Sequence, residues 1–136
     1  MINNLSIIIP IFKEKRNIEL LTNDIHKKLK KVKFEIIFVD DNSKDGSYQI
    51  LKKLKKNNKA KFIIRKAKKK DLTQSCFDGI KKSKYENVLI MDGDLQHNPK
   101  YIYKMLKILF TKKMDIVVGA RNFREKNINK SLTFLR

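Results

Sequence analysis

The sequence predicts an α/β fold: a mostly parallel sheet with helices on both faces. Short apolar runs alternate with amphipathic segments along the chain, and acidic turns directly follow some of these runs. Strands and helices in such alternation are joined by right-handed crossovers, which place helices on the two faces of a parallel sheet. The length of 136 residues fits a single domain with a real hydrophobic core.

The expected strands are the apolar runs, which are short and rich in isoleucine and valine. They span residues 5–10, 34–39, 61–65, 87–91 and 115–120. Each run is followed by polar or turn-forming residues. We therefore expect the ends of these strands to carry any functional side chains.

The expected helices have apolar residues spaced by three and four, as in Ile18, Leu21 and Ile25. They span residues 17–31, 47–57, 72 onward and 98–111, with a further short helix near 132–135. Asp71 is expected to cap the third of these helices, with Gln74 completing a capping box. Asn98 is expected to cap the fourth, with Pro99 at its first position.

Two acidic turns follow apolar runs and predict a site for a metal and a phosphate. Asp92 and Asp94 flank Gly93 directly after the run that ends at Met91. Carboxylate oxygens are the ligands that Mg²⁺ and Mn²⁺ prefer, with substrate phosphates and water completing the shell. Gly93 lacks a Cβ, so a phosphate or a sugar can approach its backbone closely. The turn that begins Asp40-Asp41 follows a second apolar run, and we expect it at the same edge of the sheet.

The formal net charge of +19 raises the hypothesis of a basic nucleic-acid-binding module. Nearly all the excess is lysine, however, whereas arginine is the usual residue for reading bases and clamping phosphates. The acidic turns also oppose this hypothesis, because carboxylates without a metal repel phosphates. The basic charge remains compatible with attraction of nucleotide phosphates and of anionic lipid head groups.

Several other classes of protein are disfavoured by the sequence. The single cysteine excludes a disulfide within the chain, and no apolar run approaches the length that spans a bilayer. No signal peptide is visible, so we expect a cytoplasmic protein, or one at the cytoplasmic face of a membrane. Neither a Walker A loop nor a glycine-rich dinucleotide loop is present.

The motifs at the strand ends resemble those of inverting family 2 glycosyltransferases. Residues 10–18 resemble their Pro-x-Tyr-Asn-Glu-x-x-Asn-Ile segment, and residues 39–47 resemble their Val-Asp-Asp-x-Ser-x-Asp-Gly-Thr turn. Residues 91–99 are similar to the Met-Asp-Ala-Asp-Leu-Gln-His-Pro-Pro segment of the polyprenyl- and dolichol-phosphate mannose synthase branch. Residues 117–121 match the Val-x-Gly-x-Arg strand that follows. The resemblance implies the GT-A nucleotide-diphospho-sugar transferase fold, here in part.

The resemblance also implies roles for individual residues. The nucleoside pocket would be lined by Pro10, Phe12, Glu14, Val39 and Asp41, with Asp41 bonded to the base. The diphosphate and the metal would be bound by Asp92, Gly93 and Asp94, with Asp92 and Asp94 as the metal-site carboxylates and Asp94 as the direct ligand. Gln96 would lie near the donor sugar or in the second shell of the metal. Arg121 would face the donor phosphates or the incoming acceptor phosphate. Asp94 and Arg121 are thus the expected catalytic residues.

The sequence departs from the family pattern in three places. Phe12 replaces the usual tyrosine, and Lys13 replaces the usual asparagine. Residues 66–75 lack the pattern of small residues and glycines that is common in the family after the third strand. The Phe12 ring keeps the stacking surface of tyrosine but lacks its hydroxyl, and Lys13 lacks the side-chain amide of the family asparagine.

The function that the resemblance implies is transfer of mannose or glucose from GDP-mannose or a UDP-sugar to a polyprenyl or dolichyl phosphate. The reaction would invert the anomeric centre and use Mg²⁺ or Mn²⁺. Residues 1–121 would form the donor-binding domain, and residues 122–136 would begin a truncated acceptor-side region. The alternative is a donor-binding fragment or subunit with impaired catalysis. Contact with an anionic membrane would be peripheral.

Overall fold

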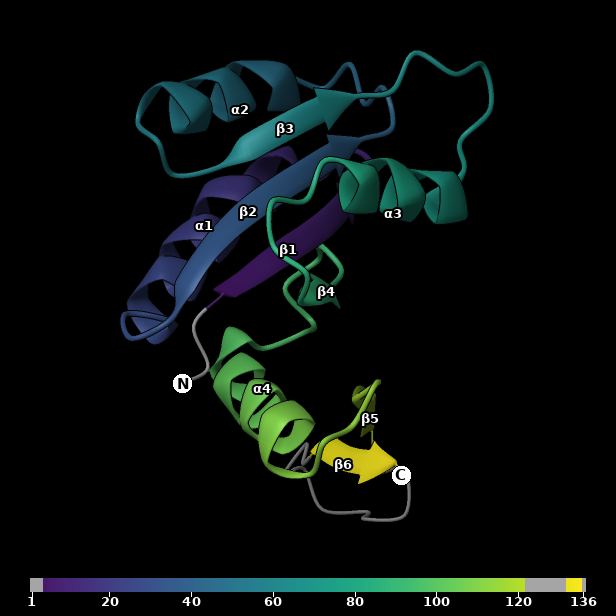
Figure 1. Cartoon of the computed structure of the whole chain (residues 1–136). Helices are drawn as coiled ribbons and strands as arrows, with labels where there is room; N and C mark the ends of the chain where they lie inside the picture. Colours follow the sequence, from purple (N-terminus) through teal and green to yellow (C-terminus); the bar gives the residue numbers. More distant parts are fainter. Residues whose placement is uncertain (1–3, 122–131, 136) are drawn as a thin grey trace. The chain divides into compact units, whose positions relative to one another are not determined.

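The computed structural model describes residues 4–121 and 132–135, with side chains described up to residue 120. The chain forms two compact units, one ending at His97 and the other beginning at Asn98. The first unit contains a four-stranded sheet and three helices, and the second contains one α-helix and a strand pair (Figure 1).

The sheet of the first unit is parallel throughout, as the sequence predicts. Its strands are β1 (Asn4–Ile11), β2 (Lys33–Asp40), β3 (Lys61–Ile64) and β4 (Val88–Ile90), in the order β3-β2-β1-β4. The pairings β1–β2, β1–β4 and β2–β3 are all parallel. The carboxyl ends of neighbouring strands therefore meet at one edge of the sheet.

Helices cover both faces of this sheet, and the predicted architecture is confirmed. Helices α1 (Lys15–Lys28) and α2 (Ser47–Lys56) lie on one face, and α3 (Leu72–Lys81) lies on the other (Figure 1). The core between them consists largely of fully buried isoleucine side chains from β1 and β2, such as Ile8 and Ile37.

Helix α3 packs closely against the sheet through small residues on its inner face. Ser75 and Gly79 are its buried residues. A Cβ at Gly79 would lie 2.3 Å from Cγ2 of Ile8, which is nearer than packed atoms approach. Glycine at this position therefore allows α3 to sit directly on β1.

The expected helix caps are present. The Asp71 carboxylate accepts a hydrogen bond from the Gln74 backbone N–H at 2.9 Å, while the Gln74 side chain donates to Asp78 rather than completing the capping box. Asn98 accepts from the Lys100 N–H at 3.0 Å and precedes Pro99 at the first position of a 3₁₀ turn. These local signals fix where the helices begin.

The second unit consists of α4 (Ile102–Thr111) after the 3₁₀ turn Pro99–Tyr101, and of strands β5 (Val118–Arg121) and β6 (Leu132–Leu135). Strands β5 and β6 are antiparallel partners. The predicted short helix near residues 132–135 is therefore wrong. Four residues are too few for a stable helix, whereas pairing with β5 gives their backbone groups hydrogen bonds.

No helix in the described part of the chain is long and apolar enough to cross a bilayer.

Candidate functional site

Loops rich in polar residues leave the carboxyl ends of β1, β2 and β4, which are neighbouring strands. Residues 12–14 follow β1, residues 41–46 follow β2, and residues 91–97 follow β4. A further loop, residues 65–71, leaves the end of β3. In open parallel sheets this edge is where ligands bind.

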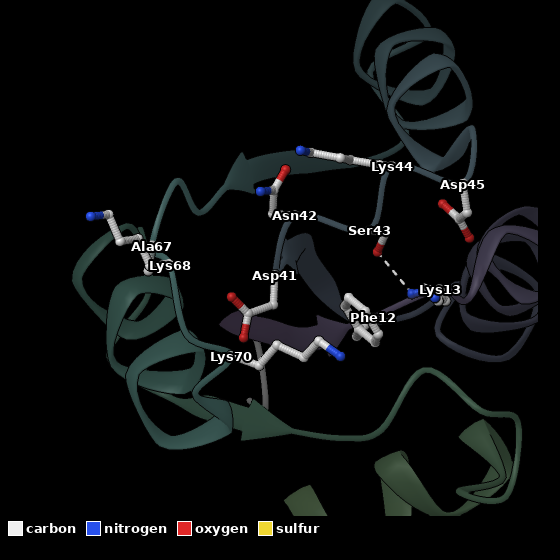
Figure 2. Close-up of a pocket in the computed structure, with 10 residues that line it drawn as sticks. All are labelled: Phe12, Lys13, Asp41, Asn42, Ser43, Lys44, Asp45, Ala67, Lys68 and Lys70. Carbon is white, nitrogen blue, oxygen red and sulfur yellow. Dashed lines mark hydrogen bonds between the residues drawn. The ribbon is translucent and has the colours of Figure 1, made fainter.

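A hollow of about 580 Å³ opens between the loops after β1, β2 and β3 (Figure 2). Its wall combines one aromatic ring with cationic and anionic side chains. The lining residues are Phe12, Lys13, Asp41, Asn42, Ser43, Lys44, Asp45, Ala67, Lys68 and Lys70. Phe12 and Asp41, which the sequence analysis assigned to a nucleoside pocket, thus face the same hollow.

Asp40 and Ser43 tie the loop after β1 to the loop after β2. The Ser43 hydroxyl donates to the Asp40 carboxylate, and the Ser43 N–H lies 3.2 Å from the same oxygen. The Lys13 N–H in turn donates to the Ser43 hydroxyl oxygen at 2.8 Å. Burial raises the pKa of the Asp40 carboxyl; hydrogen bonds from Ser43 oppose this rise, and the charges of Asp45 and Asp41 add to it. Asp40 therefore shapes the wall of the hollow from a buried position.

Asp41 is held by a buried ion pair that the sequence analysis did not predict. The Arg65 guanidinium donates to one Asp41 carboxylate oxygen at 2.6 Å, and both side chains are less than 10% exposed. The other carboxylate oxygen accepts the Asp71 backbone N–H at 2.7 Å. Arg65 also donates to Asp78 on α3 at 3.2 Å. The orientation of Asp41 is therefore fixed from two sides.

The Asp92-Gly93-Asp94 turn is also organised by its own loop. The Asp92 N–H donates to Nδ1 of His97 at 3.1 Å, and Nε2 of His97 lies 3.6 Å from an Asp92 carboxylate oxygen. Asp94 accepts the Gln96 N–H at 2.9 Å. A Cβ at Gly93 would lie 2.6 Å from Cγ2 of Ile11. Close packing against β1 is thus a structural reason for glycine at position 93.

These carboxylates fit a divalent metal that is shared with a ligand. No group of three or more His, Cys, Asp or Glu side chains that could hold a metal exists among the described residues. Asp92 is exposed and Asp94 is half-buried. One or two carboxylates with phosphate oxygens and water form a usual Mg²⁺ or Mn²⁺ shell, whereas a structural zinc site needs more protein ligands.

The remaining predicted residues lie outside the hollow. Pro10 and Val39 form a side-by-side pair on β1 and β2 and are buried in the sheet, so they support the hollow without lining it. Glu14 lies beside a neighbouring hollow of about 370 Å³ and accepts a hydrogen bond from Asn17. Arg121 is the last residue of β5, in the second unit, and its side chain is outside the described part.

The fold is that of an α/β protein with a polar site at the carboxyl ends of its parallel strands, and comparison with known proteins identifies its family. The profile of glycosyl transferase family 2 matches residues 6–133. The chain belongs to this family.

Curated relatives include two enzymes named dolichol-phosphate mannosyltransferase. The protein from Pyrococcus furiosus is 34% identical over 116 residues, which cover 85% of this chain and 32% of the relative. The protein from Saccharomyces cerevisiae is 34% identical over 107 residues, which cover 76% of this chain and 40% of the relative. The chain therefore spans well under half the length of these relatives.

A solved structure supports the fold. A mannosyltransferase from Pyrobaculum calidifontis, determined with GDP-Man and Mn²⁺, superimposes with a TM-score of 0.64 at 20% identity. The match covers 85% of this chain and 33% of the mannosyltransferase. The GT-A fold predicted from the sequence is confirmed over this part.

Proposed function

We propose that this chain binds a nucleotide-diphospho-sugar and serves in transfer of its sugar, mannose or glucose, to a polyprenyl or dolichyl phosphate. One observation carries the proposal. The chain is a member of glycosyl transferase family 2 and has a hollow that is lined by Phe12 and Asp41. The acidic turn 92–94 lies at the same edge of the same parallel sheet. The relatives named dolichol-phosphate mannosyltransferase support this acceptor class.

The nucleoside part of the donor would occupy the hollow after β1 and β2. The Phe12 ring offers a surface for stacking, and the Asp41 carboxylate offers an acceptor for base N–H groups. Because Arg65 and the Asp71 N–H fix Asp41, the acceptor is already oriented before a ligand enters. Pro10 and Val39 would hold this wall from beneath, and Glu14 would border it.

The diphosphate would lie at the turn after β4, with Asp92 and Asp94 as the metal-site carboxylates and Asp94 as the direct ligand. A bound Mg²⁺ or Mn²⁺ would stabilise the negative charge that develops on the leaving diphosphate. The Gln96 N–H donates to the Asp94 carboxylate, and the Asp92 backbone N–H donates to the His97 ring, so both residues of the turn are held by their own loop. Gln96 would lie near the donor sugar, and the sequence resemblance assigns Arg121 to the phosphates.

The proposed acceptor is a lipid phosphate, which implies that the protein works at a membrane surface. A lipid phosphate is already anionic at neutral pH, so its oxygen would attack the anomeric carbon without a strong base. The attack would come from the face opposite the nucleoside diphosphate, whose bond to the sugar would break as the new bond forms, and the centre would invert. The excess of lysine would attract the protein to anionic lipid head groups at the cytoplasmic face of a membrane. The charge supports peripheral contact of this kind.

The test is the metal dependence of donor binding in the variant Asp94→Asn. Asparagine keeps an acceptor for the Gln96 N–H, so the turn is retained, but it removes the charge that holds a metal. Titration calorimetry with GDP-mannose and UDP-glucose should show that Mn²⁺ tightens binding to the wild type. We expect the variant to lose this gain, a change of about tenfold or more.

The matched control is Glu86→Gln, which neutralises an exposed carboxylate in the loop before β4. We expect it to leave the metal-dependent gain unchanged. If Asp94→Asn binds both donors as tightly as the wild type in the presence of Mn²⁺, the metal assignment is wrong. If the wild type binds neither donor, the proposed function is wrong.

A further inference from the structure

Lys70 covers the aromatic ring in the candidate nucleoside pocket. Its ammonium nitrogen lies 3.6 Å from the centre of the Phe12 ring, well within the range of a cation–π contact. Figure 2 shows the Lys70 side chain running past Asp41 towards Phe12. The next residue, Asp71, donates its N–H to Asp41 at 2.7 Å, so the backbone beside Lys70 is anchored to the same pocket.

The hollow carries an excess of uncompensated positive charge. Its lysines are Lys13, Lys44, Lys68 and Lys70, and within the described residues none of them forms an ion pair. The two carboxylates on the wall are already engaged. Asp41 is paired with Arg65, and Asp45 accepts hydrogen bonds from Ser47 and from the Lys15 N–H. An anion entering the hollow therefore meets cations that lack a carboxylate partner.

We propose that Lys70 makes nucleotide binding depend on the diphosphate: it occupies the stacking face of Phe12 in the empty site and moves to the phosphates when a donor enters. The inference rests on the proposed function, in which a base stacks on Phe12. Lys70 would then determine the specificity for phosphate-bearing nucleotides. It lies in the segment 66–75, where the sequence departs from the family pattern.

The physical reason is a competition between two partners for one ammonium group. A nucleoside that stacks on Phe12 must displace Lys70 and offers it no anion in return. A nucleoside diphosphate displaces the same contact but supplies phosphate oxygens, and charge-assisted hydrogen bonds to phosphate are stronger than an exposed cation–π contact. Lys70 therefore disfavours ligands without phosphates and favours those that carry them.

The experiment measures nucleoside and nucleoside diphosphate binding to Lys70→Ala by titration calorimetry. The probes are guanosine, GDP, uridine and UDP, all with a chelator present so that no metal contributes. We expect the variant to bind the diphosphates about tenfold more weakly. We expect it to bind the nucleosides about two- to fivefold more tightly, because the ring face is uncovered.

Two further variants separate this role from a general charge effect. Lys70→Arg keeps a cation that can lie on the ring and bind phosphate, and it should keep the wild-type preference. Lys69→Ala removes an exposed neighbouring charge that does not line the hollow, and it should also keep the preference.

The inference is overturned if Lys70→Ala retains the wild-type ratio of diphosphate to nucleoside affinity within about twofold, a difference of about 0.4 kcal/mol. It is also overturned if Lys69→Ala lowers the ratio as much as Lys70→Ala, since the effect would then be general electrostatics. If the wild type binds no nucleotide under any condition, the proposed function fails first, and this inference fails with it.

Discussion

Asp41 stabilises the fold in addition to its proposed contact with the base. Its carboxylate is paired with Arg65, and both side chains are buried. Removal of one partner from a buried pair leaves the other charge without compensation, which is strongly destabilising. A variant at position 41 therefore changes stability as well as affinity, and the two effects need separate measurement.

We expect Asp41→Ala to lower the free energy of unfolding by about 3 kcal/mol, at the lower end for a broken buried pair because Arg65 keeps Asp78. The double variant Asp41→Ala/Arg65→Met should recover part of this loss, since it leaves no uncompensated guanidinium. Urea denaturation of the single and double variants checks this. Equal losses in both variants would show that the pair does not act as described.

The role of Asp41 in the site could be predicted from the sequence, whereas its ion pair with Arg65 could not, for a physical reason. Asp41 follows an apolar run, and its position is therefore visible in the local pattern. Arg65 directly follows β3, 24 residues from Asp41 in the sequence, and only the pairing of β2 with β3 brings the two side chains together. Lys70 and Phe12 are an analogous case, because their contact depends on how the loop after β3 folds back.

Glu35 of β2 connects three other segments at the amino-terminal edge of the sheet. Its carboxylate accepts from the Ser6 hydroxyl of β1 at 2.7 Å, from the Lys61 ammonium of β3 at 2.6 Å, and from the Lys84 N–H before β4. Burial raises the pKa of Glu35, but these hydrogen bonds and the Lys61 charge outweigh it, so the pKa is lowered overall.

A carboxyl with a lowered pKa in the folded state stabilises the protein above the pKa of the unfolded chain and loses this contribution as the pH falls. We expect Glu35→Gln to reduce the free energy of unfolding by about 1 kcal/mol at pH 7 and by little near pH 3. Urea denaturation of the wild type and the variant at the two pH values measures this difference in the free energy of unfolding.

The exposed pair of Glu19 and Lys53 offers the matched control, because a surface ion pair contributes little to stability. Glu19→Gln should therefore leave the free energy of unfolding nearly unchanged at both pH values. A Glu35→Gln variant that is as stable as Glu19→Gln at pH 7 would contradict the role assigned to Glu35.

Elements with strong local signals were predicted correctly, whereas β6, which depends on its pairing with β5, was predicted wrongly as a helix. The Asp71 and Asn98 caps and the strands β1, β2, β3 and β4 follow from local patterns. Strand β6 has only four residues and no period, so its partner decides its conformation. The first helix was predicted at 17–31 but runs from Lys15 to Lys28, an offset typical of helix ends.

Over the chain as a whole, five of the 14 acidic residues lie in the two turns where the proposed donor would bind. Asp40 ends β2, Asp41 and Asp45 follow it, and Asp92 and Asp94 follow β4, although the net charge of the chain is +19. Such a cluster repels phosphates unless cations compensate it. Lys70 and its neighbours supply part of this compensation, and a metal at Asp92 and Asp94 would supply the rest.

The most direct test of the central claim, that the donor binds at this edge of the sheet, is amide hydrogen exchange with and without GDP-mannose and Mn²⁺. We predict slower exchange on donor binding in residues 40–46, 66–71 and 92–97, because these loops form the proposed site. The lysine-rich helix α2 should exchange as before. Protection confined to α1 and α2, or no protection at a saturating donor concentration, would contradict the account.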